Sequence, residues 1–480
     1  MTFYSTAFLL FFVVLFAIYY FLLKGRAKAQ NALLLVASGV FYGYASLKTL
    51  PLMAVIVAVY YFLGIGIGKA TKERISSLLS TLGVVLGVGI LLYFKYLNFF
   101  IESFAALFER LGLQTNIHTF RIIMPLGISF FVFKLISYVV EIHRGHIEPT
   151  RDWVAFGTYV TFFPCIMAGP IDRPAFLGQL SKGRSFDYSL AVDGCRQFIW
   201  GLFKKVAVAD NIAGCVNVIW NDDFTTLPAG KLLMVAVLYS FQMYTDFSGY
   251  SDMAIGVGKV LGLKVARNFN YPFFAVNVAD YWRRWHMSLT SWLTDYVFMP
   301  LNVKFRDWGN VGMILAIIIN FVLVGMWHGD NWTYAVFGLY HGLLFIPLIL
   351  TGAFYKKSKI KTMFWGLPCL KDFGRMLLTF LLITIGLIIF RADTVGHAFS
   401  YIGHLFQPSI LQFDVEPRHL QCFAFIFITM LVEWSQRKHE HPLGLSAVKS
   451  VAVRYAIYLA VIVTTLVFST DSSAFIYAQF

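Results

Sequence analysis

Long apolar segments recur along this chain and constrain its fold more than any other feature. Several exceed the roughly 18 residues needed to cross a hydrocarbon layer, and we count about eleven such candidates, with shorter segments suited to re-entrant or interfacial helices. Hydrophobic residues make up 58% of the 480 and charged residues 13%, against roughly 25% charged in soluble domains. We therefore expect an all-α polytopic membrane protein.

The net charge of +14 is distributed as short basic clusters between apolar segments. Every second loop is basic, which indicates membrane topology rather than a nucleic-acid surface and places the N-terminus outside. The first three clusters are Lys24, Arg26 and Lys28, then Lys69, Lys72 and Arg74, then Arg144 and Arg151.

Neither a leader nor a metal site is expected. The first apolar segment, 8–23, has no basic residue before it and no small-residue cleavage site after it, so it should remain as the first span. The cysteines are odd in number, lack metal-ligand spacing and lie mostly in apolar surroundings, which predicts no disulfide and no zinc. They are Cys165, Cys195, Cys215, Cys369 and Cys422.

The chain reads as one membrane domain over 1–480, because no repeat, low-complexity run or soluble domain interrupts it. Residues 1–100 carry few interior charges and predict scaffold helices. Residues 121–393 hold the polar motifs described below and predict a catalytic core. Residues 394–480 return to apolar C-terminal helices.

Two segments before residue 180 predict buried polar or irregular structure. Lys134 and Glu141 share one helical face with Ser137 and Tyr138, which favours a Lys134–Glu141 contact or a lysine reaching the interface over a substrate contact. The stretch 161–174 contains three prolines and Gly169, and predicts a broken or re-entrant segment. It is either a cavity wall or a kink at a helix end.

Asp246 and Asp252 lie in sequence continuous with an apolar segment, among Tyr244, Ser248 and Tyr250. Carboxylates near a membrane interior are costly unless paired or hydrated, so a polar network is expected there. Their spacing of six puts them on different faces of a helix. We therefore favour structural anchoring over acid–base work.

Residues 277–296 mix tryptophans with cations and predict a short helix at the membrane–water interface. Asn277 should cap this helix, Asp280 should pair with Arg284 one turn later, and Trp282 and His286 should share a face. Arg283 and Arg284 have two open interpretations. They anchor lipid headgroups, or they contact an anionic carrier.

His328 ends about sixteen apolar residues and is followed by Gly329, Asp330 and Asn331. A histidine in a membrane helix more often hydrogen-bonds between helices than catalyses, so this motif alone favours a structural role. Gly325 and Gly329 should let a neighbouring helix or substrate chain approach closely. On one continuous helix His341 would lie about 220° from His328, on another face.

Several motifs in this order resemble the membrane-bound O-acyltransferases, and in particular the bacterial branch that O-acetylates alginate. The resemblance implies that His328 is the essential catalytic residue and that His286 lies near the reaction tunnel. The motifs are LGISFFVFKLISYVVEIHRG, FFPCIMAGPIDRP, YTDFSGYSDMAIG, NFNYPFFAVNVADYWRRWHMSLTSWLTDYVFMPL, GMWHG and FRADT.

Acyl transfer from a thioester to a hydroxyl needs a base, and neutral histidine suits that role. We therefore expect His328 to take the hydroxyl proton and His286 to orient the donor or polarise its carbonyl. Arg283 and Arg284 should hold a carrier phosphate, with Trp285 and Trp327 as further donor contacts. The expected donor is acyl-CoA or another acyl thioester, used as substrate with no bound cofactor.

The resemblance further implies the membrane half of a relay in a bacterial inner membrane. A periplasmic or extracellular partner would then place the acyl group, most simply acetyl, on an envelope polysaccharide, with lipids as the surrounding partners. Two alternatives stay open. One is an O-acyltransferase directed at a lipid, and the other is a polysaccharide or lipid transporter, although transporters usually show matching halves.

Overall fold

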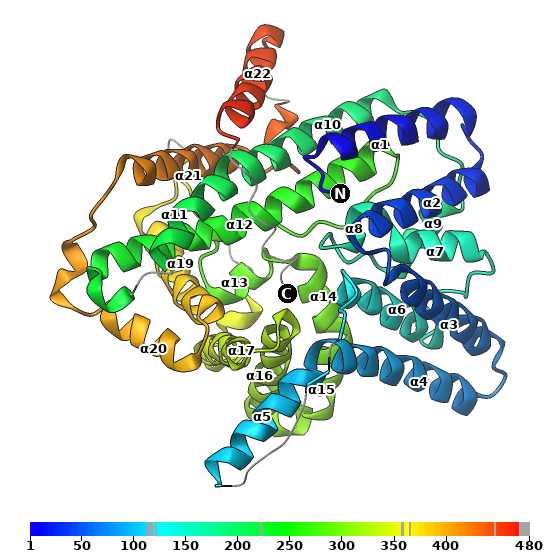
Figure 1. The fold of residues 1–480 in the computed structure, drawn as a ribbon, viewed down its shortest axis with the longest axis horizontal. Helices are drawn as coiled ribbons and strands as arrows, with labels where there is room; N and C mark the ends of the chain where they lie inside the picture. Colours follow the sequence, from blue (N-terminus) through cyan, green and yellow to red (C-terminus); the bar gives the residue numbers. More distant parts are fainter. Residues whose placement is uncertain are drawn as a thin grey trace. The chain divides into compact units, whose positions relative to one another are not determined.

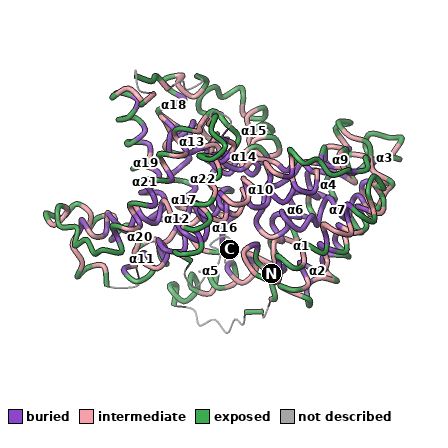
Figure 2. The backbone as a smooth tube through the Cα atoms, turned by 90° about the horizontal axis from the view of Figure 1, so that it is seen from above, coloured by how far each residue is buried: buried purple, intermediate pink, exposed green. Residues whose placement is uncertain are grey.

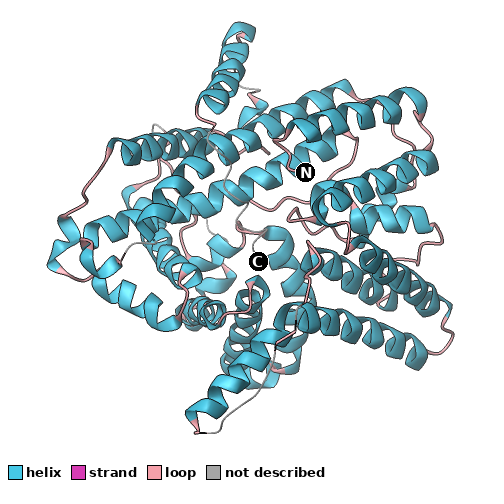
Figure 3. Ribbon diagram, in the orientation of Figure 1, coloured by secondary structure: helices cyan, strands magenta, loops and turns pink. Residues whose placement is uncertain are grey.

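Helices form the regular structure wherever the computed structural model describes the chain, namely residues 1–112, 119–120, 122–220, 223–356, 360–363, 366–445 and 448–469. Figure 3 shows these helices joined by loops. Within the same ranges, β-type pairing is limited to an isolated bridge between Thr362 and Pro368. The predicted all-α fold is confirmed.

The chain divides into two compact units. Unit 1 comprises Met1–Cys195 and Ala254–Ala266, and unit 2 comprises Arg196–Met253 and Arg267–Phe480. Two long helices, α10 (Tyr188–Leu202) and α12 (Ala229–Val260), contribute residues to both units. The predicted single domain over 1–480 and its subdivision into scaffold, core and C-terminal parts stay predictions, and residues 470–480 of the last part lie outside the described ranges.

Unit 1 contains the N-terminal helices, coloured blue to cyan in Figure 1. Helices α4 and α6 pack closely, and α3 joins them through the Tyr60 hydroxyl, which donates to the Gly83 carbonyl of α4 at 2.6 Å. The helices are α1 (Thr6–Ala17), α2 (Ala27–Ser46), α3 (Leu50–Lys69), α4 (Glu73–Leu91), α5 (Leu97–Arg110), α6 (Ile128–His143), α7 (Trp153–Thr161), α8 (Phe163–Ile166) and α9 (Leu177–Leu180).

Unit 2 contains the later helices, green to red in Figure 1. A π-helix, η4 (Phe203–Ala209), precedes α11. The remaining helices are α11 (Asp210–Trp220), α13 (Val278–Trp282), α14 (Met287–Leu293), α15 (Met299–Lys304), α16 (Gly309–His328), α17 (Trp332–Leu344), α18 (Ile346–Leu350), α19 (Leu370–Arg391), α20 (Val395–His404), α21 (Pro417–Ser435) and α22 (Val451–Val467).

By length and composition, five helical segments within the described residues can cross a membrane. They are Leu50–Lys69, Glu73–Arg110, Arg306–His328, Trp332–Leu350 and Leu370–Arg391, and two shorter apolar helices, Thr6–Leu22 and Val451–Val467, accompany them. A multi-pass arrangement follows. The predicted number of about eleven spans stays a prediction.

Burial separates interior helices from outward-facing ones. α6 is buried along nearly its whole length, whereas the most apolar windows of the spans Leu50–Lys69 and Glu73–Arg110 are only 28% and 17% buried. Figure 2 shows the same contrast between purple α6 and the greener α3 and α4. Because apolar residues left exposed on a spanning helix contact lipid, α3 and α4 have the character expected of scaffold helices.

Candidate active site

His328 is buried at the last position of α16. Gly329 continues in extended backbone, with φ −173° and ψ 178°, and thereby ends the helix. Asn331 then begins α17 as an N-cap, because its side chain accepts the Thr333 N–H at 3.0 Å. A short extended connection therefore lets the chain turn back directly after the histidine.

α17 runs antiparallel to α16, and glycine sets how closely the two helices approach. A Cβ added to Gly325 of α16 would overlap the Tyr334 carbonyl oxygen of α17. Gly338 of α17 likewise faces the backbone of Phe321. The predicted close approach of a neighbouring helix beside His328 is confirmed.

His328 lines a narrow cavity of about 10 Å³ that lies wholly within unit 2. Such a volume holds about one water molecule. The walls are aromatic and aliphatic apart from two histidines, His328 and His341. The lining is Met243, Tyr281, Trp282, Trp285, His328, Phe337, His341, Ile383, Leu387 and Phe390.

The position of His341 corrects the sequence analysis. The separation of about 220° assumed that one helix runs through both histidines, whereas the chain turns back at Gly329, so that both rings reach the same cavity. His341 is 1% exposed and accepts the Trp282 indole N–H at Nδ1, 3.3 Å away. In the sequence, Gly329 followed by the helix-capping residue Asn331 was the signal that α16 ends before a new helix begins.

His286 is also buried in unit 2, between α13 and α14. Its backbone is left-handed, with φ 44°, and it precedes α14 as the N-cap, four residues after α13 has ended at Trp282. The prediction that Trp282 and His286 share a helix face is therefore wrong. The His286 ring packs edge-on against Phe247 and Trp327, with centroids 4.7 and 5.6 Å apart. Burial lowers the pKa of His286 to about 3, so the ring is neutral at pH 7.

The two predicted tryptophan contacts are buried beside these histidines. Trp327 packs edge-on against His286 on one side and His328 on the other, with the His328 centroid 4.8 Å away. Trp285 stacks on Tyr281 at 5.5 Å and lines the cavity with it. Trp327 therefore contacts both predicted catalytic histidines.

The two arginines differ in their partners. Arg284 donates from Nε to Asp280 at 3.0 Å, and the Asn277 side chain accepts the Asp280 N–H at 2.8 Å, so both predicted contacts of this helix are confirmed. Arg283 is exposed and reaches the Phe354 carbonyl at 3.4 Å. Of the pair, Arg283 presents the more accessible guanidinium.

Buried lysines neutralise the two aspartates of α12. Lys205 lies 2.8 Å from Asp246 and 2.8 Å from Asp210. Lys204 lies 2.7 Å from Asp252, which also accepts from Gln197 at 2.7 Å. Both lysines come from η4, so these ion pairs connect η4 to α12. The geometry agrees with the anchoring role favoured above.

Lys134 and Glu141 do not pair, contrary to the sequence analysis. Lys134 is 1% exposed, and its Nζ donates to the Tyr159 carbonyl at 3.3 Å, so it does not reach the interface either. Glu141 instead contacts His146 at 2.8 Å and Arg144 at 3.6 Å. Two helical turns separate Lys134 from Glu141, a rise of about 10 Å, and nearer cations take the carboxylate.

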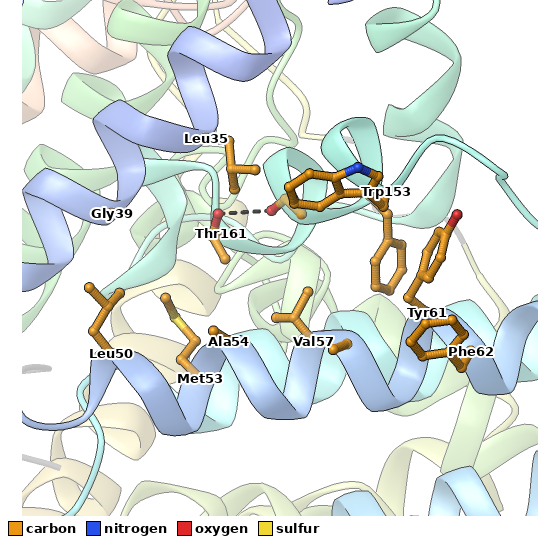
Figure 4. Close-up of a pocket in the computed structure, with 13 residues that line it drawn as sticks. Leu35, Gly39, Leu50, Met53, Ala54, Val57, Tyr61, Phe62, Trp153 and Thr161 are labelled. Atoms are coloured by element: carbon orange, nitrogen blue, oxygen red, sulfur yellow. Dashed lines mark hydrogen bonds between the residues drawn. The ribbon is translucent and has the colours of Figure 1, made fainter.

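The proline-rich segment is broken, as predicted. α7 ends at Thr161, α8 spans Phe163–Ile166, and irregular, largely buried chain follows to Pro174. Thr161 also lines a cavity of about 490 Å³ between α2, α3 and α7 of unit 1, and its hydroxyl donates to the Gly157 carbonyl at 2.8 Å (Figure 4). This larger cavity has apolar walls without a histidine or carboxylate, so it lacks a base for acyl transfer.

Two cysteines lie side by side. The sulfurs of Cys215 in α11 and Cys422 in α21 are 3.5 Å apart, and both side chains are buried. Among the described residues, no three side chains of His, Cys, Asp or Glu converge as metal ligands. The expected absence of metal and disulfide chemistry stays a prediction.

Comparison with known proteins identifies the class to which this fold and site belong. Residues 144–385 match the membrane-bound O-acyltransferase family model, a range that contains His286, His328 and His341. The chain belongs to the membrane-bound O-acyltransferase family. It is a multi-pass membrane enzyme that transfers acyl groups to hydroxyls.

Individual relatives of the chain are bacterial acyltransferases. A probable alginate O-acetylase of Azotobacter vinelandii is 36% identical over 412 residues, which are 85% of this chain and 78% of the relative. The peptidoglycan O-acetyltransferase of Helicobacter pylori is 32% identical over 359 residues, 68% of this chain and 66% of the relative. The teichoic acid D-alanyltransferase of Bacillus subtilis is 32% identical over 239 residues, 47% and 58% of the two chains.

Proposed function

We propose that the protein takes an acetyl group from a cytoplasmic acyl thioester and passes it through the membrane toward a cell-envelope polysaccharide. The relatives named above act on alginate, peptidoglycan and teichoic acid, which supports an envelope polymer as the final acceptor. The proposed location is the bacterial inner membrane with the N-terminus outside, in line with the alternating basic loops.

The observation that carries this proposal is His328 in the wall of a narrow, largely aromatic cavity. The walls are apolar and aromatic apart from the two histidines, and closing such a site to bulk water would protect a reacting thioester from hydrolysis. A neutral imidazole there takes the proton of an attacking hydroxyl, and the tetrahedral oxyanion then expels the thiolate. His286, neutral because of its burial, supports the donor side through Trp327.

Coenzyme A or another pantetheine carrier is the proposed donor. Its phosphates need a cation that is not already paired, and exposed Arg283 meets that requirement better than Arg284, which is bound to Asp280. Trp285 and Trp327 offer aromatic surface to the pantetheine arm. We propose that a separate extracytoplasmic protein receives the acyl group and places it on the polymer.

The direct test replaces His328 with alanine in purified enzyme. Transfer of radiolabelled acetyl from acetyl-CoA to an acceptor should fall to background, while yield and thermal midpoint in detergent stay near those of the wild type. His146→Ala is the matched control, because His146 is an exposed histidine of unit 1 and should leave transfer unchanged. Transfer retained by folded His328→Ala protein would refute the assignment.

The acceptor is tested in cells. Deleting the gene should remove ester-linked acetyl from envelope polysaccharide, and His328→Ala should reproduce that loss. Loss of acylated lipid with unchanged polysaccharide would instead favour the lipid-directed alternative. Altered polysaccharide export with normal acetylation would favour the transporter.

A further inference from the structure

His341 lines the cavity that holds His328, and one of its buried ring nitrogens has no hydrogen-bond partner among the described residues. Its Nδ1 accepts the indole N–H of Trp282 at 3.3 Å. For Nε2 the described residues provide no hydrogen-bond partner, although the side chain is 1% exposed. Buried polar atoms are paired in the large majority of cases, so an unpaired one in a cavity wall points to a ligand atom that comes and goes.

The contact with Trp282 determines where the proton of His341 resides. An indole nitrogen only donates, so Nδ1 must offer a lone pair. A doubly protonated imidazole has no lone pair at Nδ1, so the contact identifies the neutral ring with its proton on Nε2. His341 therefore presents an N–H donor for which the described part of the chain supplies no acceptor.

Helix α19 approaches this nitrogen closely at a glycine. A Cβ added to Gly386 would lie 2.6 Å from Nε2 of His341. The neighbouring residues Ile383, Leu387 and Phe390 of α19 line the same cavity. Glycine at this position keeps a side chain from pressing on Nε2, as any added Cβ would.

We propose that His341 is a catalytic residue that donates a hydrogen bond from Nε2 to the carbonyl oxygen of the acyl group during transfer. The inference rests on the proposed function and adds an oxyanion donor to the base His328. In the step, the acceptor oxygen bonds to the carbonyl carbon while His328 takes its proton, and the carbonyl π electrons move to oxygen beside His341 Nε2–H. The C–S bond then breaks, and the departing thiolate takes the proton from His328.

The alternative role is packing. His341 contacts Phe337 with centroids 4.6 Å apart and Trp282 at 5.1 Å, both edge-on, so a bulky ring alone could fill the site. The two roles differ in what they require of the side chain. A hydrogen-bond donor must have its N–H at the position of Nε2, whereas a packing role requires only a side chain of similar volume.

The experiment compares His341→Gln with His341→Asn in folded, purified enzyme. The glutamine amide places an N–H near the Nε2 position, and the asparagine amide places one only near Nδ1. We expect H341N to lower kcat by about 10²- to 10³-fold, as for removal of an oxyanion donor, with KM for acetyl-CoA nearly unchanged. H341Q should retain kcat within about tenfold of the wild type.

Two glycine variants test the same donor without touching it. Gly386→Ala puts a methyl against Nε2 and should lower kcat, whereas Gly374→Ala on the same helix meets nothing within 4 Å and should not. Equal activity of H341N and wild type, or equal loss in H341Q and H341N with lowered thermal midpoints, would overturn the role of His341. Transfer retained by His328→Ala would instead refute the proposed function, so the two failures are distinguishable.

Discussion

Replacing Lys205 with methionine removes the ammonium that Asp210 and Asp246 share. Both carboxylates lie 2.8 Å from Nζ and are at most 4% exposed. Removing one partner of a buried pair costs about 3–5 kcal/mol, because a buried charge is left uncompensated. If one carboxyl group is protonated at pH 7 instead, the cost is about 4 kcal/mol relative to its reference pKa. Whether the carboxylate stays charged or takes up a proton, the variant should therefore lose a similar, large amount of folding free energy.

Asp246→Asn supplies the contrast within the same cluster. It leaves Lys205 paired with Asp210, so the expected cost is that of an altered buried hydrogen bond, about 1 kcal/mol. Lys231→Met is the surface control, because its partner Asp414 is 65% exposed, and exposed pairs contribute about 0–1 kcal/mol.

Thermal unfolding in detergent, followed by size-exclusion fluorescence, should rank the losses of stability in the order Lys205→Met, Asp246→Asn, Lys231→Met. The deficit of Lys205→Met should shrink as the pH falls toward 4, because the orphaned carboxyl groups take up protons more easily. Acetyl transfer per folded molecule should survive Asp246→Asn. A stable Asp246→Asn enzyme without transfer would refute anchoring and favour acid–base chemistry at Asp246.

Three further outcomes test other parts of the structure. Gly325→Ala should separate α16 from α17, because its methyl overlaps the Tyr334 carbonyl; both stability and transfer should drop, and an unchanged midpoint would contradict the packing. The pKa of His286 is about 3 in the folded protein and about 6.5 in the unfolded chain. Its contribution to stability is therefore complete above pH 6.5 and is lost at about 1.4 kcal/mol per pH unit as the pH falls from 6.5 to 3. The thermal midpoint of His286→Phe should accordingly depend less on pH in that window than the midpoint of the wild type. Mild oxidation should form a disulfide between Cys215 and Cys422, whose sulfurs are 3.5 Å apart. In thiol labelling of the unfolded protein, both cysteines should then lose their reactivity together. Labelling of one without the other would argue against the packing of α11 on α21.

Much of this protein follows from short-range sequence pattern. The apolar segments predict helices because their backbone groups need no water, and α3, α4, α16 and α19 form where the pattern places them. Local hydrogen bonds were equally predictable. Asn277, Asp280 and Arg284 lie within two helical turns, so chain geometry alone brings them together.

Contacts between distant segments were decided by the tertiary structure. Asp246 and Asp252 are costly carboxylates when considered alone, but their partners Lys205 and Lys204 come from 41 and 48 residues earlier in the chain. A periodic pattern describes one helix and holds no information about which other helix packs against it. Lys134 was assigned the wrong partner for the same reason.

The histidines show both sides of this division. His328 and His286 were identified from their motifs, because motif order is a property of the sequence. Their shared contact with Trp327, and the entry of His341 into the cavity, depend on a backbone that turns left-handed at His286 and extended at Gly329. Sequence determined that this is a membrane acyltransferase with apolar helices and two candidate histidines. Tertiary structure alone decided which rings face one cavity, because a turn of a few residues redirects every side chain that follows.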